Sequence, residues 1–349
     1  MGGLSQQQLV QAVLGTGAVV AGGITGGEVY RRRRAAVRKV RGMGHGGEER
    51  MVTTADGTNL HVEIDGSECA PLTVVFTHGW FMDLTTWRHQ RAALAGSPAR
   101  RVYYDHRGYG KSERGPKGVG SVRQLAEDFY QVIEAVAPSG PVVIVGHSMG
   151  SFTIQALAGI HPELFGTRIV ASVLISTAAQ GSTLIRAVVR NIPVAHRIVS
   201  PTAGVLEIAA ILRPYLVRAL GMGLYRPFSY LFVDRKSSTE AKREFLAVIS
   251  AAHLDVMGEY LLALAAHEEL ASLPALGNAR TLVITGGHDL IVVPALSEAA
   301  AAQIPGVEHV IIPGSGHIVP FERADEVNRL LGDVIDNALA KVKAGKRAG

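Results

Sequence analysis

Residues 141–150 read PVVIVGHSMG, and this stretch decides the fold. Its run VVIVG is apolar at nearly every position, as in a strand that is buried on both faces of a parallel sheet. Residues 151–160 (SFTIQALAGI) follow with the composition of a buried helix. The pattern G-x-S-x-G therefore joins a strand to a helix, which predicts a sharp turn with Ser148 exposed at the helix N-terminus.

The residues around Ser148 suit a nucleophile. Gly146 and Gly150 flank it, and a Cβ at either position would crowd the neighbouring strands at so sharp a turn. At the helix N-terminus, the amide of Met149 can donate a hydrogen bond to an oxyanion, and the helix dipole favours the negative charge that develops there. We therefore predict that Ser148 is the nucleophile and that Met149 provides one oxyanion donor.

A serine hydroxyl needs a base, and the base needs an acid to orient it. His317 follows the apolar run HVIIP in the small-residue loop GSGH, and Asp289 follows the run LVITGGH. These positions predict His317 as the base and Asp289 as the acid, in the chain order Ser, Asp, His. The segment after VASVLIS (170–176) offers no competing acid. We interpret His288 as structural, since adjacent residues at a strand end point in different directions.

Further apolar runs, separated by Gly, Asp and Ser or by helical patterns, predict an α/β fold. The fold is a mostly parallel eight-stranded sheet flanked by helices. RMVTTADGTNLHVEI (50–64) reads as a hairpin about Asp56-Gly57. The other strands are expected within 72–80, 101–108, 141–148, 169–176, 280–289 and 307–317, and a helix is expected over 121–137.

About a hundred residues separate two of these strands, too many for a simple crossover connection. We predict a helical cap over 180–275, inserted into an α/β core that comprises residues 48–179 and 276–340. Five prolines are expected to break the cap into short helices: Pro193, Pro201, Pro214, Pro227 and Pro274. Its aromatic residues favour an apolar path to the serine, although they could equally form an apolar underside that docks on the core: Tyr215, Tyr225, Phe228, Tyr230, Phe232 and Phe245.

The net charge of +5 comes from the two ends of the chain. The excess of positive charge lies in residues 31–41 (RRRRAAVRKVR) and in the basic C-terminal tail 341–349. Elsewhere acidic side chains outnumber basic ones. A nucleic-acid interface on the body is therefore not expected. Residues 1–47 combine an apolar segment with this basic stretch, so residues 9–41 predict contact with a membrane lipid surface.

Residues 9–27 are long enough to anchor the chain in a membrane, but six glycines lower their hydrophobicity. The arginines that follow would keep the catalytic domain on the cytoplasmic side. One alternative is a helix that lies on the body or on a membrane surface, in which case the protein is expected to be soluble and cytoplasmic. The other is a processed signal, in which case the protein is exported to the cell envelope. Cys69 is the single cysteine and is interpreted as an inert loop thiol.

The early strand VVFTHGW ends in His78-Gly79-Trp80-Phe81. The amide of Trp80 is expected to be the second oxyanion donor, and the side chains of Trp80 and Phe81 are expected to contact substrate. The alternative for the Trp80 side chain is core packing. A further motif, DHRGYGKS (105–112), is interpreted as turn-building and ion-pairing.

Together, the segments HGW, YDHRGYGKS, GHSMG and GSGH, with Asp289, resemble the α/β-hydrolase superfamily over about residues 50–338. The resemblance is to its esterase, lipase and cofactor-free perhydrolase (non-haem haloperoxidase) group, and it implies hydrolysis of a carboxylic ester with no cofactor or metal. The cap aromatics favour an apolar ester. Epoxide hydrolases and haloalkane dehalogenases place aspartate where Ser148 stands. Phe81 stands where the perhydrolases often have proline, so perhydrolysis is the alternative, and a ligand-binding receptor on a hydrolase scaffold is another.

Overall fold

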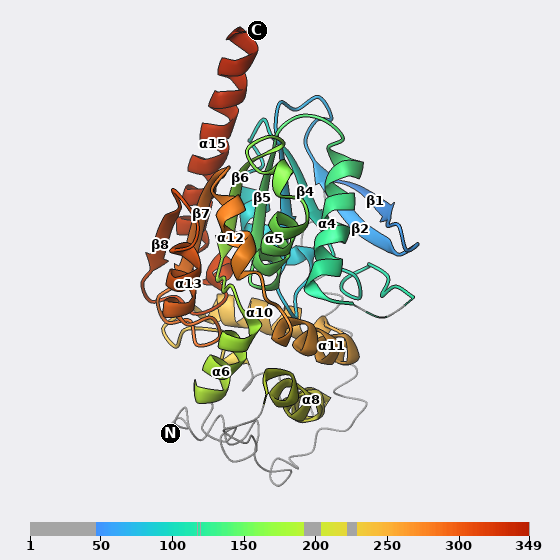
Figure 1. The fold of residues 1–349 in the computed structure, drawn as a ribbon, viewed down its shortest axis with the longest axis vertical. Coiled ribbons are helices and arrows are strands. Elements are labelled where there is room, and N and C mark those ends of the chain that lie inside the picture. The colour runs from blue at the N-terminus through green and yellow to red at the C-terminus, as the bar shows by residue number, and fades with distance from the viewer. Residues whose placement is uncertain (1–46, 117, 119, 192–203, 222–228, 349) are drawn as a thin grey trace.

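The computed structural model describes residues 47–116, 118, 120–191, 204–221 and 229–348. Eight strands form one sheet in the order β1-β2-β4-β3-β5-β6-β7-β8 (Figure 1). The strands are β1 (Glu48–Thr53), β2 (Asn59–Asp65), β3 (Thr73–Thr77), β4 (Arg100–Tyr104), β5 (Val142–His147), β6 (Ile169–Ile175), β7 (Arg280–Gly286) and β8 (Glu308–Ile312).

The pairs from β4 to β8 are parallel, and the pairs β1–β2 and β2–β4 are antiparallel. The predicted hairpin joins β1 and β2, and Gly57 takes the positive φ of its turn, +83°. Every predicted strand is present, which confirms the mostly parallel eight-stranded fold. Because parallel strands end at the same edge, the loops after β3, β5, β7 and β8 meet there.

The sheet separates two hydrophobic cores, because side chains alternate between its faces. On β5, Val142 and Ile144 belong to one core, and Val143 and Val145 belong to the other. The first core is covered by α4 and α5, and the second by η1 and α15. The body helices are α3 (Arg88–Ala93), α4 (Val122–Val136), α5 (Met149–Ile160), α12 (Leu273–Leu276), α13 (Pro294–Ala301), α14 (Val319–Glu322) and α15 (Ala324–Ala348), with short 3₁₀ turns η1 (Leu84–Trp87), η2 (Pro162–Leu164) and η3 (Leu270–Ser272).

The predicted cap contains helices that lie together beyond one end of the sheet (Figure 1). They are α6 (Gly181–Asn191), α8 (Val205–Gly221), α10 (Thr239–Ala251) and α11 (Leu254–Ala265). The predicted break at Pro214 is wrong, because α8 continues through this residue. A proline removes one N–H from a helix, and the packing of α8 on α6 and α11 accounts for its continuity there.

Several predictions fall on residues outside the described part. These are the apolar segment 9–27 with the arginine run 31–41, together with Pro193, Pro201, Tyr225, Pro227 and Phe228.

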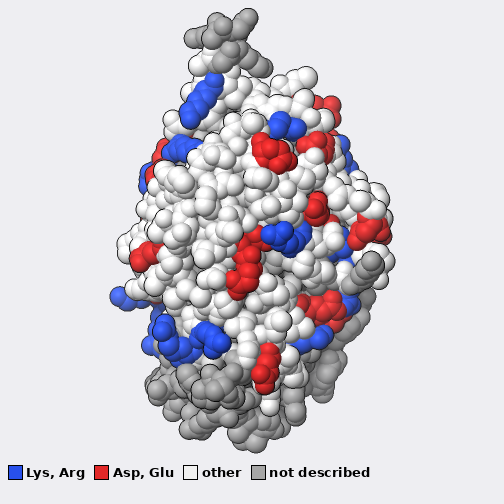
Figure 2. Space-filling model, in the orientation of Figure 1, with Lys and Arg blue, Asp and Glu red and all other residues white. Residues whose placement is uncertain are grey.

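In the described ranges no individual helix has the length and apolar composition for a membrane crossing, while α10 and α11 meet these criteria only as a pair bent by 99°. The residues of the predicted basic tail up to Ala348 continue α15, which extends away from the sheet in Figure 1. On the face drawn in Figure 2, basic and acidic side chains are interspersed over the body.

Candidate active site

The three side chains predicted to act together lie at the C-terminal edge of the parallel strands. Ser148 follows β5, Asp289 follows β7, and His317 follows β8. The Nε2 atom of His317 is 2.9 Å from Ser148 Oγ, and its Nδ1 atom is 2.8 Å from Asp289 Oδ2. This is the geometry of a nucleophile, a base and an orienting acid. The structure thus brings the predicted residues together, and their catalytic roles stay a prediction.

Ser148 lies at the sharp turn that the sequence predicted. Its φ of 53° and ψ of −114° are sparsely populated by non-glycine residues, so the surrounding contacts must hold this conformation. A Cβ at Gly150 would come within 2.2 Å of the Thr77 carbonyl oxygen, and one at Gly146 would come within 2.6 Å of the Gly150 backbone. The flanking glycines are therefore required by close backbone packing.

His317 is held through its backbone as well as its ring. Its N–H donates to the Phe232 carbonyl at 2.7 Å. Its carbonyl accepts from His147 Nε2 at 2.8 Å and from Ser176 Oγ at 3.3 Å. These partners come from three separate segments, so the position of the imidazole depends on β5, β6 and the cap together.

Sequence reasoning missed His147, although this residue directly precedes Ser148. Burial, with a smaller contribution from neighbouring His317, lowers the pKa of the His147 ring to about 3. The ring is therefore neutral at neutral pH and donates its one N–H to the His317 carbonyl. Its place inside G-x-S-x-G was the available signal, but the contact partner lies 170 residues away.

Asp289 is fixed by its own loop. Its Oδ1 atom accepts from the backbone N–H groups of Ile291 at 2.8 Å and Val292 at 2.9 Å. Its Oδ2 atom is left to face the His317 ring. The two backbone bonds to Oδ1 fix the orientation of the carboxylate group, so Oδ2 stays aligned with the imidazole of His317.

The two predicted oxyanion donors lie beside Ser148. Met149 is the first residue of α5, and a Cβ at Gly79 would come within 2.8 Å of His147 Nδ1, so the loop that carries Trp80 packs against the turn. Among the described residues, none accepts a hydrogen bond from the backbone N–H of Trp80 or of Met149. Their role as oxyanion donors stays a prediction.

The predicted substrate residues pack against the cap. The Trp80 ring donates its Nε1–H to the Met257 carbonyl on α11 at 3.1 Å, and it lies against Phe81 with ring centroids 3.7 Å apart. Phe81 is fully buried, has a φ of 66° and contacts Phe232. Phe232 in turn lies 5.6 Å from the His317 ring, centroid to centroid. Aromatic ring contacts thus connect the cap to His317.

The other cap aromatics differ in their surroundings. Phe245 is buried and contacts Phe232, whereas Tyr215 on α8 is 42% exposed. The predicted apolar surroundings therefore come from Phe232 and Phe245 of the cap, and Tyr215 faces outward.

The motif DHRGYGKS forms turns and ion pairs, as predicted. Arg107 donates to both carboxylate oxygens of Asp128, at 2.6 and 2.5 Å, and also pairs with Asp56 at 2.9 Å. Asp105 accepts from the backbone N–H groups of Leu84 and Lys111. The motif ties the loop after β4 to α4 and to the β1–β2 hairpin.

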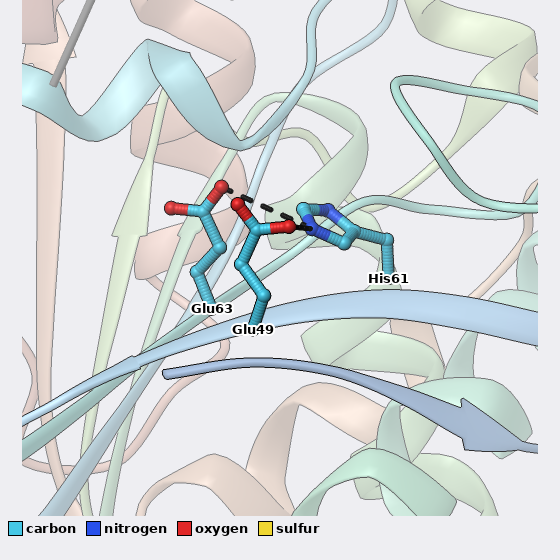
Figure 3. A group of neighbouring side chains, drawn as sticks. All are labelled: Glu49, His61 and Glu63. Atoms are coloured by element: carbon cyan, nitrogen blue, oxygen red, sulfur yellow. Dashed lines mark hydrogen bonds and ion pairs between the residues drawn. The ribbon is translucent and has the colours of Figure 1, made fainter. Parts of the chain in front are cut away.

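One group of side chains has the spacing of a metal site. It consists of Glu49, His61 and Glu63 on β1 and β2, with ligand atoms all within 4.8 Å of one another (Figure 3). Cationic side chains already lie beside both carboxylates: Lys111 pairs with Glu49 at 2.8 Å, and Arg91 pairs with Glu63. For His61, burial lowers the pKa of the ring, but the hydrogen bond to Asp105 and the negative charges of Asp105 and Glu63 together outweigh it, so the pKa is raised. The group is accounted for as an ion-pair network at the antiparallel end of the sheet.

Comparison with known proteins gives the following matches. Residues 74–330 match the model described as "Alpha/beta hydrolase family". Epoxide hydrolase B of Mycobacterium tuberculosis is 33% identical over 110 residues, which are 31% of this chain and only 30% of the relative. Among solved structures, a thermophilic esterase from Thermogutta terrifontis is 25% identical with a TM-score of 0.62, covering 84% of this chain and 99% of that one. The enol-lactonase from Burkholderia xenovorans LB400 is 28% identical with a TM-score of 0.64, covering 81% and 98%.

Proposed function

This chain belongs to the alpha/beta hydrolase family, and from that premise we propose that it is a serine hydrolase that cleaves carboxylic esters. The observation that carries the proposal is the hydrogen-bonded series Ser148 Oγ, His317 Nε2, His317 Nδ1 and Asp289 Oδ2. It supplies an activated alcohol nucleophile, which suits acyl transfer. The similar esterase and enol-lactonase structures support an ester or lactone as the bond attacked.

The reaction proceeds in two halves. Ser148 Oγ attacks the ester carbonyl while His317 Nε2 takes the hydroxyl proton, and the backbone N–H groups of Trp80 and Met149 bind the oxyanion. The alcohol leaves with the proton from His317, and the acyl group stays on Ser148. Water then attacks the acyl-enzyme with His317 as base, which releases the acid and restores the serine. Asp289 stabilises the imidazolium in both halves.

An apolar acyl or alcohol group fits the surroundings of the site. Phe81, Phe232 and Phe245 form a connected aromatic set that reaches the His317 ring. Such side chains favour apolar ligands, and the polar groups at the turn fix the carbonyl. The substrate class is therefore an apolar carboxylic ester.

Epoxide hydrolysis is the activity in the name of a sequence relative, but that likeness spans only 110 residues. Epoxide hydrolases attack with an aspartate at the position of Ser148. An alcohol nucleophile would give a stable ether with an epoxide, whereas a serine ester is readily hydrolysed. Ester cleavage is thus the reaction that suits this nucleophile.

Ser148→Ala tests the proposal. The variant should lose labelling by a fluorophosphonate and lose turnover of p-nitrophenyl acetate or butyrate by several orders of magnitude, because the nucleophile is gone. Ser67→Ala is the matched control, since Ser67 lies in the turn after β2 and should label as the wild type does. Undiminished labelling of Ser148→Ala would contradict the assignment.

A further inference from the structure

A short stretch of the cap reaches the loops of both the base and the acid. Residues 232–237, called the cap segment below, contact the loop that carries His317. The Phe232 carbonyl accepts from the backbone N–H of His317 at 2.7 Å and of Ile318 at 3.3 Å. A Cβ at Gly316 would come within 2.7 Å of Phe232 O and of Asp234 N, so the two backbones are in direct contact.

Glu322 joins the same two segments with its carboxylate. Its Oε1 atom accepts from the backbone N–H of Gly316 at 3.0 Å. Its Oε2 atom accepts from the backbone N–H of Asp234 at 2.8 Å and from the Ser237 hydroxyl. One oxygen therefore holds the residue before His317, and the other holds the cap segment.

The side chain of Asp234 extends the contact to the acid loop. Its Oδ2 atom lies 2.6 Å from Nδ1 of His288, the residue before Asp289. The backbone N–H of His288 donates to Ser315 O at 2.8 Å, so the acid and base loops also contact each other. The predicted structural interpretation of His288 agrees with these bonds.

We propose that Glu322 is a positioning residue that couples docking of the cap segment to the placement of His317. The inference rests on the proposed function, because it assigns the way in which the base of that reaction is held. While the carboxylate binds both segments, the Phe232 carbonyl stays beside the His317 N–H. When this link is lost, the cap segment and the base loop can separate, and the imidazole leaves the line between Ser148 and Asp289.

A carboxylate is required at this position because both of its oxygens face donors. In Glu322→Gln the amide keeps one acceptor oxygen, and its NH₂ group must face either Gly316 N–H or Asp234 N–H. A donor that faces a donor loses the bond, so one half of the link fails while the size of the side chain is unchanged. Glu326→Gln, one turn further along on α15 where the side chain is 47% exposed, is the matched control.

The test compares full-length Glu322→Gln, Glu326→Gln and the wild type. For a p-nitrophenyl ester we expect kcat of Glu322→Gln to fall about ten- to a hundredfold, with KM changed by less than about threefold, because misplacement of a reacting group acts on the chemical step. The low-field ¹H resonance of His317 Nδ1–H, bonded to Asp289, should broaden or disappear. The control should match the wild type in all three measurements. Wild-type kcat together with a retained resonance in Glu322→Gln would overturn the proposal.

One further variant and one further measurement, amide hydrogen exchange, cover the cases in which Glu322→Gln does not fold or the wild type is inactive. If Glu322→Gln does not fold, Ser237→Ala removes one bond at Oε2, and faster hydrogen exchange of the Gly316 and His317 amides is then expected, whereas unchanged exchange overturns the link. If the wild type neither labels at Ser148 nor cleaves esters, the proposed function fails. The resonance and the amide exchange still decide the coupling, since neither needs turnover.

Discussion

At the scale of single residues, the alignment of His317 depends on the charge and the acceptor atoms of Asp289. The Asp289 Oδ2 atom accepts from His317 Nδ1, so the proton is absent from Nε2 and this atom can take one from Ser148. Asp289→Asn can present an amide N–H to the ring and favour the wrong tautomer. We expect ester turnover to fall by roughly 10³ to 10⁴, measured as kcat with a short aryl ester.

The matched control for this variant is Asp325→Asn, which changes an exposed acid in the first turn of α15. It should leave kcat unchanged. A loss of less than about tenfold in Asp289→Asn would mean that another carboxylate orients the base.

Prediction from the sequence identified some residues of the candidate site and missed others. Ser148, Asp289 and His317 each follow an apolar strand and have small neighbours, and these local features identify them. Phe232 and Glu322 have no such signal, and the place of His147 inside G-x-S-x-G does not identify its partner, because each of these residues acts through a contact with the backbone of a residue far along the chain.

At the scale of the elements, a buried ion pair fixes α4 to the loop after β4. Arg107 and Asp128 are both almost fully buried and bind through two parallel hydrogen bonds. Asp128→Asn removes the buried charged partner of the guanidinium and leaves it with Asp56, whose side chain is 34% exposed. We expect the free energy of unfolding to fall by about 3 kcal/mol, measured by urea denaturation.

Glu127→Gln lies one residue away on the same helix, with its side chain 44% exposed. Its effect on the urea midpoint should be within error. A shift in Asp128→Asn no larger than that of this control would mean that Asp56 alone satisfies Arg107.

Prediction of the elements followed the strength of their periodic patterns. The strands were found because alternating or continuous apolar runs reflect burial by a sheet. The break at Pro214 was wrong, because the packing of α8 outweighs the local preference of proline.

At the scale of the whole molecule, buried histidines make stability depend on pH. Burial lowers the pKa of five rings: His78 to about 4, His147 and His267 to about 3, His106 well below its ordinary value, and His309 below its ordinary value. In the unfolded chain these rings titrate near 6.5. As pH falls below about 6.5 the unfolded chain binds protons that the folded protein does not, so the free energy of unfolding falls.

Each such histidine contributes up to about 1.4 kcal/mol per pH unit between roughly pH 6 and 4. His61 acts in the opposite sense, because its pKa is raised, but among the described residues it is one ring against five with a lowered pKa. Urea midpoints measured from pH 7 to 5 should therefore fall steadily, and His267→Gln should reduce the slope. A midpoint that is constant or rises over this range would show that the rings are protonated in the folded protein.

The sequence by itself determined the strands, the turn at Ser148 and the order of Ser148, Asp289 and His317, because these features are written in patterns of at most a few tens of residues. Only the tertiary structure decided what holds His317 in place. The link from Asp234 to Glu322 spans 88 residues, and the bond from His147 to the His317 carbonyl spans 170. Such contacts depend on how the cap docks on the sheet. Since nearly every residue carries the same backbone carbonyl and N–H, the sequence does not indicate which of these groups makes the contact.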